Sequence, residues 1–181
     1  MKISVAPLMK QPYGASEIHD VSEAPITPRG EHATLLEIGV QAVEGDARFT
    51  HTNLGVLVQG TVRADVEFEC GRCLDRFVSD VSARLEEQYY ATIDVVSGAA
   101  LPEPPPDAPA IGHDFLIDVT PLIREHVLLE LPLKPLCREA CAGICPTCGI
   151  DQNVRPHRHD NADEDERWSQ LRTLLADFTE K

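Results

Sequence analysis

Six cysteines constrain this chain of 181 residues more than any other feature, because their spacing is typical of metal ligands. The first two, Cys70 and Cys73, are separated by two residues. The other four follow the pattern C-x3-C-x3-C-x2-C and are Cys137, Cys141, Cys145 and Cys148. A two-residue gap lets a tight turn direct both thiolates at one cation, and Gly71 and Gly149 allow the backbone such a turn requires. Two such turns supply the four sulfurs that tetrahedral zinc prefers.

The cellular compartment decides whether these cysteines are metal ligands or form disulfides. Residues 1–10 hold no extended apolar segment of the kind found in signal peptides. The sequence also contains no apolar run long enough to predict a transmembrane helix. We therefore expect a cytoplasmic protein without a membrane partner, in which cysteines are more often metal ligands. Disulfides are the alternative, because the number of cysteines is even, but a chain of this size does not need such cross-links.

The acidic composition limits the possible partners. The formal net charge is −14, so the chain as a whole will not bind nucleic acid through bulk attraction. The Cys-rich segment is the least acidic part of the chain, because residues 134–159 carry more basic than acidic side chains. The candidate contacts with RNA or a partner are therefore the arginines near the cysteines, Arg72, Arg138, Arg155 and Arg158.

Apolar periodicity predicts an α+β fold with an antiparallel β-sheet, built on a long hairpin and capable of closing partly into a barrel. Valines at even positions between residues 55 and 68, and apolar residues at 77, 81 and 85, predict two long strands joined at Cys70 and Cys73. One or two helices cover the sheet. The first begins with Thr120 as N-cap and Pro121 as first helical residue, carries an apolar stripe that Leu128 and Leu129 widen, and ends before Pro132.

The remaining organisation follows from composition along the chain. Residues 1–30 predict a short strand at 3–6 and then irregular structure. Residues 31–136 form the β-rich core with the helix; within them, 33–43 predict a strand, Gly45-Asp46 a turn, and 97–112 a Pro-rich loop. Residues 137–160 are the Cys-rich zinc-binding segment with its zinc knuckle. Residues 161–181 predict a C-terminal amphipathic helix with Trp168 on its apolar face.

Six cysteines exceed one tetrahedral site, so three ligand sets compete. The first joins the two C-x2-C turns, the second uses only the four later cysteines, and the third pairs Cys70 and Cys73 with Cys137 and Cys141. The sets that join distant cysteines close a longer loop and contribute more to folding, but no spacing rule separates the three. His157 and His159 could complete a second site, but histidines in a polar tail are usually solvated. We therefore expect one structural Zn²⁺.

Catalytic motifs are absent from the sequence. A catalytic zinc keeps an open position, usually with histidine or acidic ligands and a nearby general base. The chain has no His-Glu-x-x-His and no His-x-Glu ahead of Pro-Cys-x-x-Cys, so a deaminase would lack its catalytic glutamate. Phosphate-binding and nucleophile motifs are also missing, and the cysteine spacing matches neither ferredoxin pattern. We expect a noncatalytic protein rather than an enzyme.

The cysteine segments and their surroundings resemble the YceD family, the large ribosomal RNA subunit accumulation proteins. The likeness spans roughly residues 35–178, and the matching segments are Phe68–Leu74, Leu129–Cys137, Cys141–Gly149 and Glu166–Trp168 with Leu171. The chain departs from the family at Asp165-Glu166-Arg167, where Asp-Pro-Arg is commoner, and at Asp151-Gln152-Asn153, where Asn-Leu-Asn is common. Family members vary in the second cysteine group, which favours the ligand set Cys70, Cys73, Cys137 and Cys141.

The resemblance implies a cytoplasmic bacterial or organellar protein needed for accumulation or processing of large-subunit ribosomal RNA. It would act by binding a ribosomal protein, another assembly or processing factor, or the RNA itself. Two alternatives predict different chemistry. A nucleic-acid-binding zinc ribbon would bind through its arginines in a salt-dependent manner, and a zinc-dependent RNA-processing enzyme would need an open coordination position at the metal.

Overall fold

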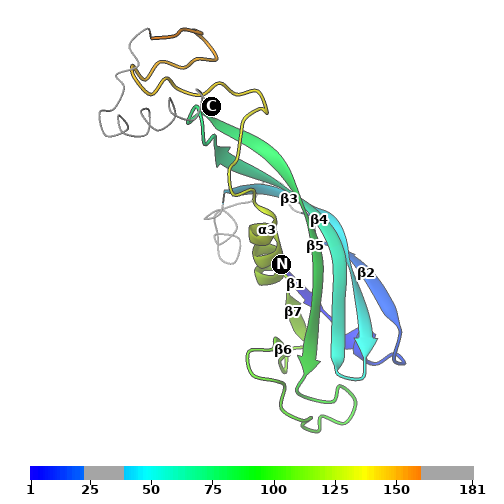
Figure 1. Cartoon of the computed structure of the whole chain (residues 1–181). Helices are drawn as coiled ribbons and strands as arrows, with labels where there is room; N and C mark the ends of the chain where they lie inside the picture. Colours follow the sequence, from blue (N-terminus) through cyan, green and yellow to red (C-terminus); the bar gives the residue numbers. More distant parts are fainter. Residues whose placement is uncertain (23–38, 160–181) are drawn as a thin grey trace, which may run out of the picture. The chain divides into compact units, whose positions relative to one another are not determined.

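The computed structural model of the chain describes residues 1–22 and 39–159, which belong to two compact units (Figure 1). The first unit comprises Met1–Gly71 and Asp75–Cys137, and the second comprises Arg72–Leu74 and Arg138–Lys181. The predicted helix at 161–181, with Trp168 and the family-like segment around it, lies outside the described residues. So does the first part of the strand predicted at 33–43.

The first unit is built on a five-stranded sheet with the order β2-β3-β4-β5-β6. Its strands are β2 (Ser16–Asp20), β3 (Val40–Thr52), β4 (Gly55–Glu69), β5 (Arg76–Ala91) and β6 (Ala110–Ile111). All neighbours are antiparallel except β5 and β6, which are parallel. Within the described residues the edge strands β2 and β6 do not pair, so the sheet is open and the partly closed barrel is not formed.

The long hairpin predicted from the sequence is confirmed as β4 and β5. Their pairing extends from Gly55 opposite Tyr90 to Glu69 opposite Arg76. Alternation explains it, because side chains of one strand point to opposite faces in turn. One face of the hairpin is buried where the even-numbered valines of β4 meet odd-numbered residues of β5. The buried residues there include Val56, Val58, Val62, Val66, Val81, Ala83, Leu85 and Tyr89. Cys70 and Cys73 follow β4 directly, in the connection to β5.

Glycine at position 45 does not form a turn, so that prediction is wrong. Strand β3 continues through Gly45, which pairs with Val62, and turns at the two residues between Thr52 and Gly55. A Cβ at Gly45 would lie 2.5 Å from the Thr61 carbonyl oxygen, and one at Gly60 would lie 2.4 Å from the Asp46 carbonyl oxygen. These glycines therefore permit close backbone approach between two strands.

Helix α3 (Thr120–Glu130) packs against β5, as Figure 1 shows. Its N-cap is Val119 rather than the predicted Thr120, and the Thr120 backbone N–H donates to Asp118 Oδ1 at 2.9 Å. Three residues of the predicted stripe are buried in the core with the sheet: Leu122, Ile123 and Val127. Leu129, predicted to widen the stripe, is 81% exposed.

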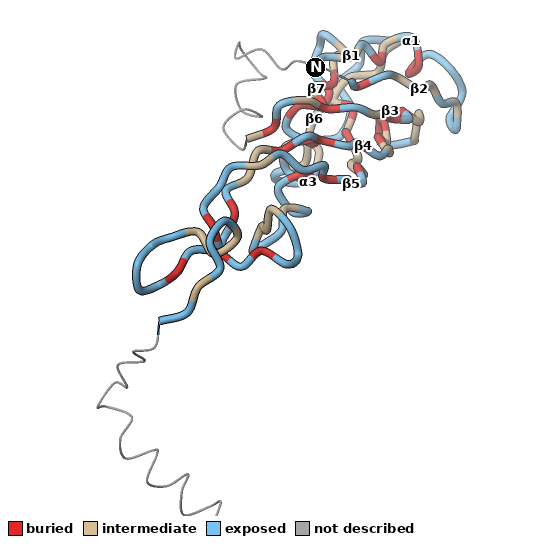
Figure 2. The backbone as a smooth tube through the Cα atoms, turned by 90° about the horizontal axis from the view of Figure 1, so that it is seen from above, coloured by how far each residue is buried: buried red, intermediate tan, exposed pale blue. Residues whose placement is uncertain are grey.

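Shorter elements complete the first unit. Strand β1 (Lys2–Ser4) pairs antiparallel with β7 (Leu116–Asp118), and β1 overlaps the strand predicted at residues 3–6. The single-turn helix α1 (Ala6–Met9) and strand β2 lie in a region predicted to be irregular, and β6 lies at the end of the predicted Pro-rich loop. Figure 2 shows the buried residues along the strands. None of the helices in residues 1–22 and 39–159 is long and apolar enough to cross a membrane.

Candidate metal centres

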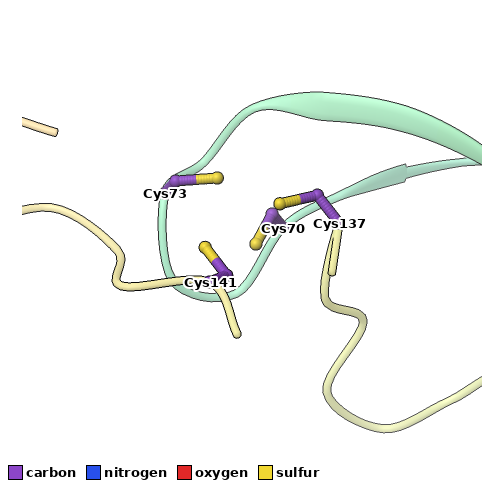
Figure 3. A group of neighbouring side chains, drawn as sticks. All are labelled: Cys70, Cys73, Cys137 and Cys141. Atoms are coloured by element: carbon purple, nitrogen blue, oxygen red, sulfur yellow. The ribbon is translucent and has the colours of Figure 1, made fainter. Parts of the chain in front are cut away.

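Four cysteine side chains converge, with their sulfur atoms within 4.8 Å of one another (Figure 3). This four-cysteine cluster consists of Cys70, Cys73, Cys137 and Cys141, of which three are buried and Cys137 is partly buried. Tetrahedral zinc with Zn–S bonds of about 2.3 Å holds its sulfurs about 3.8 Å apart, so the cluster suits that ion. Of the three competing ligand sets, the structure brings together the third, the one that the family resemblance favours.

Both C-x2-C pairs are held by the same backbone turn. In the first, the Cys70 N–H donates to the Asp75 carbonyl at 2.9 Å; in the second, the Cys145 N–H donates to the Ile150 carbonyl at 2.8 Å. The residue after the second cysteine is left-handed in each turn, with φ of +65° at Leu74 and +71° at Gly149. Hydrogen bonds and backbone angles therefore recur at matching positions in the two turns.

Gly71 has a different role from the one predicted. It is not among the described residues with positive φ, so the first turn does not use it as its left-handed residue. Its N–H donates to the Pro135 carbonyl at 2.9 Å, two residues before Cys137. This bond ties the segment that carries Cys70 to the segment that carries Cys137.

Arg72 braces the segment around Cys141. Its guanidinium donates to the Cys141 carbonyl at 2.7 Å and to the Glu139 carbonyl at 3.4 Å. Its own carbonyl accepts the Ile144 N–H at 3.0 Å and lies so close to Gly143 that a Cβ there would be 2.9 Å away. Arg72 therefore has structural contacts. The side chains of Arg138, Arg155 and Arg158 are exposed and make no hydrogen bond or ion pair with other described residues.

Asn153 supports the four-cysteine cluster, and the sequence did not identify this role. Its side-chain nitrogen donates to Cys141 Sγ at 3.5 Å, and its side-chain oxygen accepts the Ala142 N–H at 2.8 Å. The same nitrogen donates to Asp151 Oδ1 at 2.7 Å. Hydrogen bonds to a ligand atom orient it and tune its affinity for metal. The only sequence signal was the family pattern around residues 151–153.

The remaining two cysteines meet the two histidines that the sequence predicted to be solvated. Cys145, Cys148, His157 and His159 place one ligand atom each within 4.8 Å of the others, and we refer to them as the Cys/His cluster. Cys145 is buried and His157 is partly buried, while Cys148 and His159 are exposed. The described residues thus contain two clusters that could hold a metal ion, where the sequence predicted one zinc site.

The thiol of Cys145 is strongly acidified. Hydrogen bonds from the backbone N–H groups of Cys148 and Thr147 outweigh the opposing effect of burial and lower the pKa of Cys145 to about 5. The thiolate, which is the form that binds metal, is therefore its main form at neutral pH. The pKa of His157 is raised, chiefly by its hydrogen bond to the Arg155 carbonyl and also by Cys145.

Comparison with known proteins places both clusters within a matched region. Residues 58–175 match the family described as Large ribosomal RNA subunit accumulation protein YceD. The chain is 34% identical over 177 residues to uncharacterized proteins of Mycobacterium bovis and Mycobacterium tuberculosis, an alignment that covers 97% of this chain and 82% of each relative. An uncharacterized protein of Mycobacterium leprae is 34% identical over 137 residues, or 72% of this chain and 58% of that relative. No solved structure matches.

Proposed function

Because this chain belongs to the YceD family, we propose that it acts in the accumulation or processing of large-subunit ribosomal RNA. The observation that carries the proposal is the family match, which includes both cysteine turns and every residue of the two clusters. Both clusters therefore lie in the part of the chain that matches the family.

In this proposal the four-cysteine cluster holds a structural Zn²⁺. Four thiolates complete a tetrahedral site, whereas catalytic zinc has three protein ligands and an open position for water or substrate. The cluster consists of sulfur ligands alone, and three of the four are buried. Arg72 and Asn153 add hydrogen bonds that orient the Cys141 segment. These features suit a noncatalytic site whose metal contributes folding free energy.

The protein would act by binding a client of the assembly pathway. The formal net charge of −14 suits a basic client, and ribosomal proteins and many RNA-binding assembly factors are of this kind. The arginines Arg138, Arg155 and Arg158 are exposed near the clusters and could contact ribosomal RNA phosphates. We favour a protein client, because the acidic charge of the chain opposes the approach of RNA.

The test is quantification of large-subunit RNA in a deletion strain of the organism that encodes this chain. We expect mature large-subunit RNA to fall relative to small-subunit RNA, or its precursors to accumulate. A wild-type copy of the gene should restore the normal levels of mature and precursor RNA, and a copy carrying Cys73→Ser should not. His113→Ala, an exposed histidine outside both clusters, is the matched control and should restore them. Unchanged precursor and mature RNA in the deletion strain would contradict the proposal.

The zinc ribbon is the second candidate, and the two matching turns are the observation that favours it. It predicts direct RNA binding whose affinity falls steeply with salt. Replacing Arg138, Arg155 and Arg158 together with glutamine should then reduce the affinity and flatten its salt dependence. Co-purification of partners, combined with ultraviolet crosslinking of RNA in cells, separates the two candidates. Protein partners without crosslinked ribosomal RNA favour the protein client, and crosslinked RNA that is lost in the triple variant favours the zinc ribbon.

A further inference from the structure

We propose that the Cys/His cluster is a second metal site, which binds Zn²⁺ through Cys145, Cys148, His157 and His159. The four ligand atoms lie within 4.8 Å of one another, and all four residues belong to the same compact unit. This site is separate from the four-cysteine cluster and shares no ligand with it. The inference goes beyond the role in ribosomal RNA accumulation and does not depend on it.

The cysteine half of the site is already shaped for a metal. The turn that carries Cys145 and Cys148 repeats the turn that carries Cys70 and Cys73, with the same hydrogen bond and a left-handed residue at the same place. A further hydrogen bond joins the Gly149 N–H to the Cys145 carbonyl at 2.8 Å. The same backbone turn therefore serves both candidate sites.

The histidine half presents two ring nitrogens to Cys148. The Nε2 atoms of His157 and His159 lie 3.1 Å and 3.4 Å from Cys148 Sγ. Nδ1 of His157 lies 2.7 Å from the Arg155 carbonyl oxygen. A carbonyl can only accept, so Nδ1 carries the proton and the lone pair of Nε2 is left for a metal. Orientation of a ligating histidine by a backbone carbonyl is the usual arrangement at metal sites.

The segment around the site has almost no apolar core of its own. Among the described residues of this unit, the buried ones are Gly143 and three cysteines, Cys73, Cys141 and Cys145. The aliphatic side chains that could have formed a core are exposed by 39%, 42% and 76% at Ile144, Ile150 and Val154. Segments that cannot bury enough apolar surface are commonly held by metal ions. Ligation by Cys145 and His157 would fix the chain on both sides of the turn.

The ligand chemistry selects zinc and distinguishes the two sites. Two thiolates and two imidazoles are a common structural ligand set for tetrahedral Zn²⁺. Two thiolates balance the charge of the ion, so the Cys/His site is neutral when loaded, whereas four thiolates leave a net charge of −2. Because Cys148 and His159 are exposed, a chelator can reach this metal first. We expect zinc to leave the protein in two phases, the faster one from the Cys/His site.

The test uses the purified full chain loaded with zinc and then freed of excess metal. Elemental analysis should find about two zinc ions per chain in the wild type, about two in the His113→Ala control, and about one in His157→Ala/His159→Ala. X-ray absorption at the zinc edge should show on average about three sulfurs and one nitrogen per zinc in the wild type. In the double variant it should show four sulfurs, at about 2.3 Å, and no nitrogen.

A rescue variant protects the test against misfolding. His157→Cys/His159→Cys keeps four ligands at the site, so it should bind about two zinc ions with sulfur ligands only. If the double alanine variant loses both metals, recovery of two in the cysteine variant supports the site, and failure to recover them overturns it. One zinc in the wild type, or two in the double alanine variant, also overturns it.

Discussion

The side-chain amide of Asn153 donates a hydrogen bond to the sulfur of Cys141, with 3.5 Å between Nδ2 and Sγ. The same amide is fixed by Asp151 and by the backbone of Ala142, at 2.7 Å and 2.8 Å. Its position is therefore set before any metal binds. An oriented hydrogen-bond donor fixes the direction in which a ligating sulfur points, so we expect Asn153 to act as a positioning residue.

Replacing Asn153 should weaken zinc binding at the four-cysteine cluster. We expect Asn153→Ala to lower the affinity about 10- to 100-fold, the usual effect of losing a group that orients a metal ligand. Competition with a chromophoric chelator measures the affinity, and the His157→Ala/His159→Ala background leaves only this site to follow. The neighbouring Gln152→Ala is the control and should leave the affinity unchanged. Equal affinities in the two variants would mean that the Asn153 hydrogen bond does not act on the metal.

Substitutions at the left-handed residue of each cysteine turn should change stability in opposite directions, with glycine at position 74 stabilising and alanine at position 149 destabilising. Leu74 has φ of +65° and is 55% exposed, so it has a left-handed backbone without much packing in return. Because this conformation costs a non-glycine residue about 1–2 kcal/mol, Leu74→Gly should raise the free energy of unfolding by up to about 1 kcal/mol. Gly149→Ala should lower it by about 1 kcal/mol. Urea unfolding of the zinc-loaded protein measures both, and a destabilised Leu74→Gly variant would contradict this reasoning.

Arg72 should contribute more to stability than the exposed arginines Arg138, Arg155 and Arg158. Arg72→Met keeps the aliphatic stem but removes the hydrogen bonds to the Cys141 and Glu139 carbonyls. We expect a loss of about 1–2 kcal/mol in the free energy of unfolding, because hydrogen bonds from a charged group contribute more than neutral ones. Arg158→Met, which removes an exposed side chain, is the control and should change it little. Similar unfolding midpoints for both variants would mean that the hydrogen bonds of Arg72 do not stabilise the protein.

The close approach of β3 and β4 can be tested at its glycines. Gly45→Ala and Gly60→Ala each bring a methyl group against a backbone carbonyl at 2.5 Å and 2.4 Å, so the strands must move apart. We expect each to lower the free energy of unfolding by about 1–3 kcal/mol, as overpacking does. At Gly71, where the nearest atom is 3.6 Å away, alanine fits. Gly71→Ala is therefore the control. Thermal unfolding, followed by circular dichroism, compares the three variants, and equal melting temperatures would refute the steric argument.

The elements that the sequence predicted well are those with a strong local pattern. Alternation of Val56, Val58 and Val62 identifies β4, and Pro121 and Pro132 enclose α3. Gly45 was misread because a glycine that allows a turn and one that admits a neighbouring strand look alike in sequence. The difference lies in Thr61, sixteen residues away, which only the register of the ladder brings near.

The candidate sites were likewise predictable where the pattern is local, and not where contacts depend on the path of the chain. Spacing identified all six cysteines as ligand candidates, because a C-x2-C turn is local. It could not choose the four that meet, since this depends on the path between Cys73 and Cys137. The contributions of Asn153, His157 and His159 depend on how the chain returns after Gly149. No local pattern encodes that return, so the histidines were expected to remain solvated.

The shortage of buried apolar side chains in residues 138–159 determines how a protease will treat the metal-free chain. Without ligation, little remains to hold that segment closed, whereas the hydrogen-bonded ladder of β4 and β5 contains Arg63 and Arg84 within it. Trypsin should therefore cut after Arg138 and Arg158 within minutes of chelation and leave Arg63 and Arg84 uncut, and added zinc should prevent both cleavages. Mass spectrometry of the fragments reads the result, and cleavage that ignores zinc would refute it. We therefore expect cellular proteases to degrade residues 138–159 faster when the cell is short of zinc.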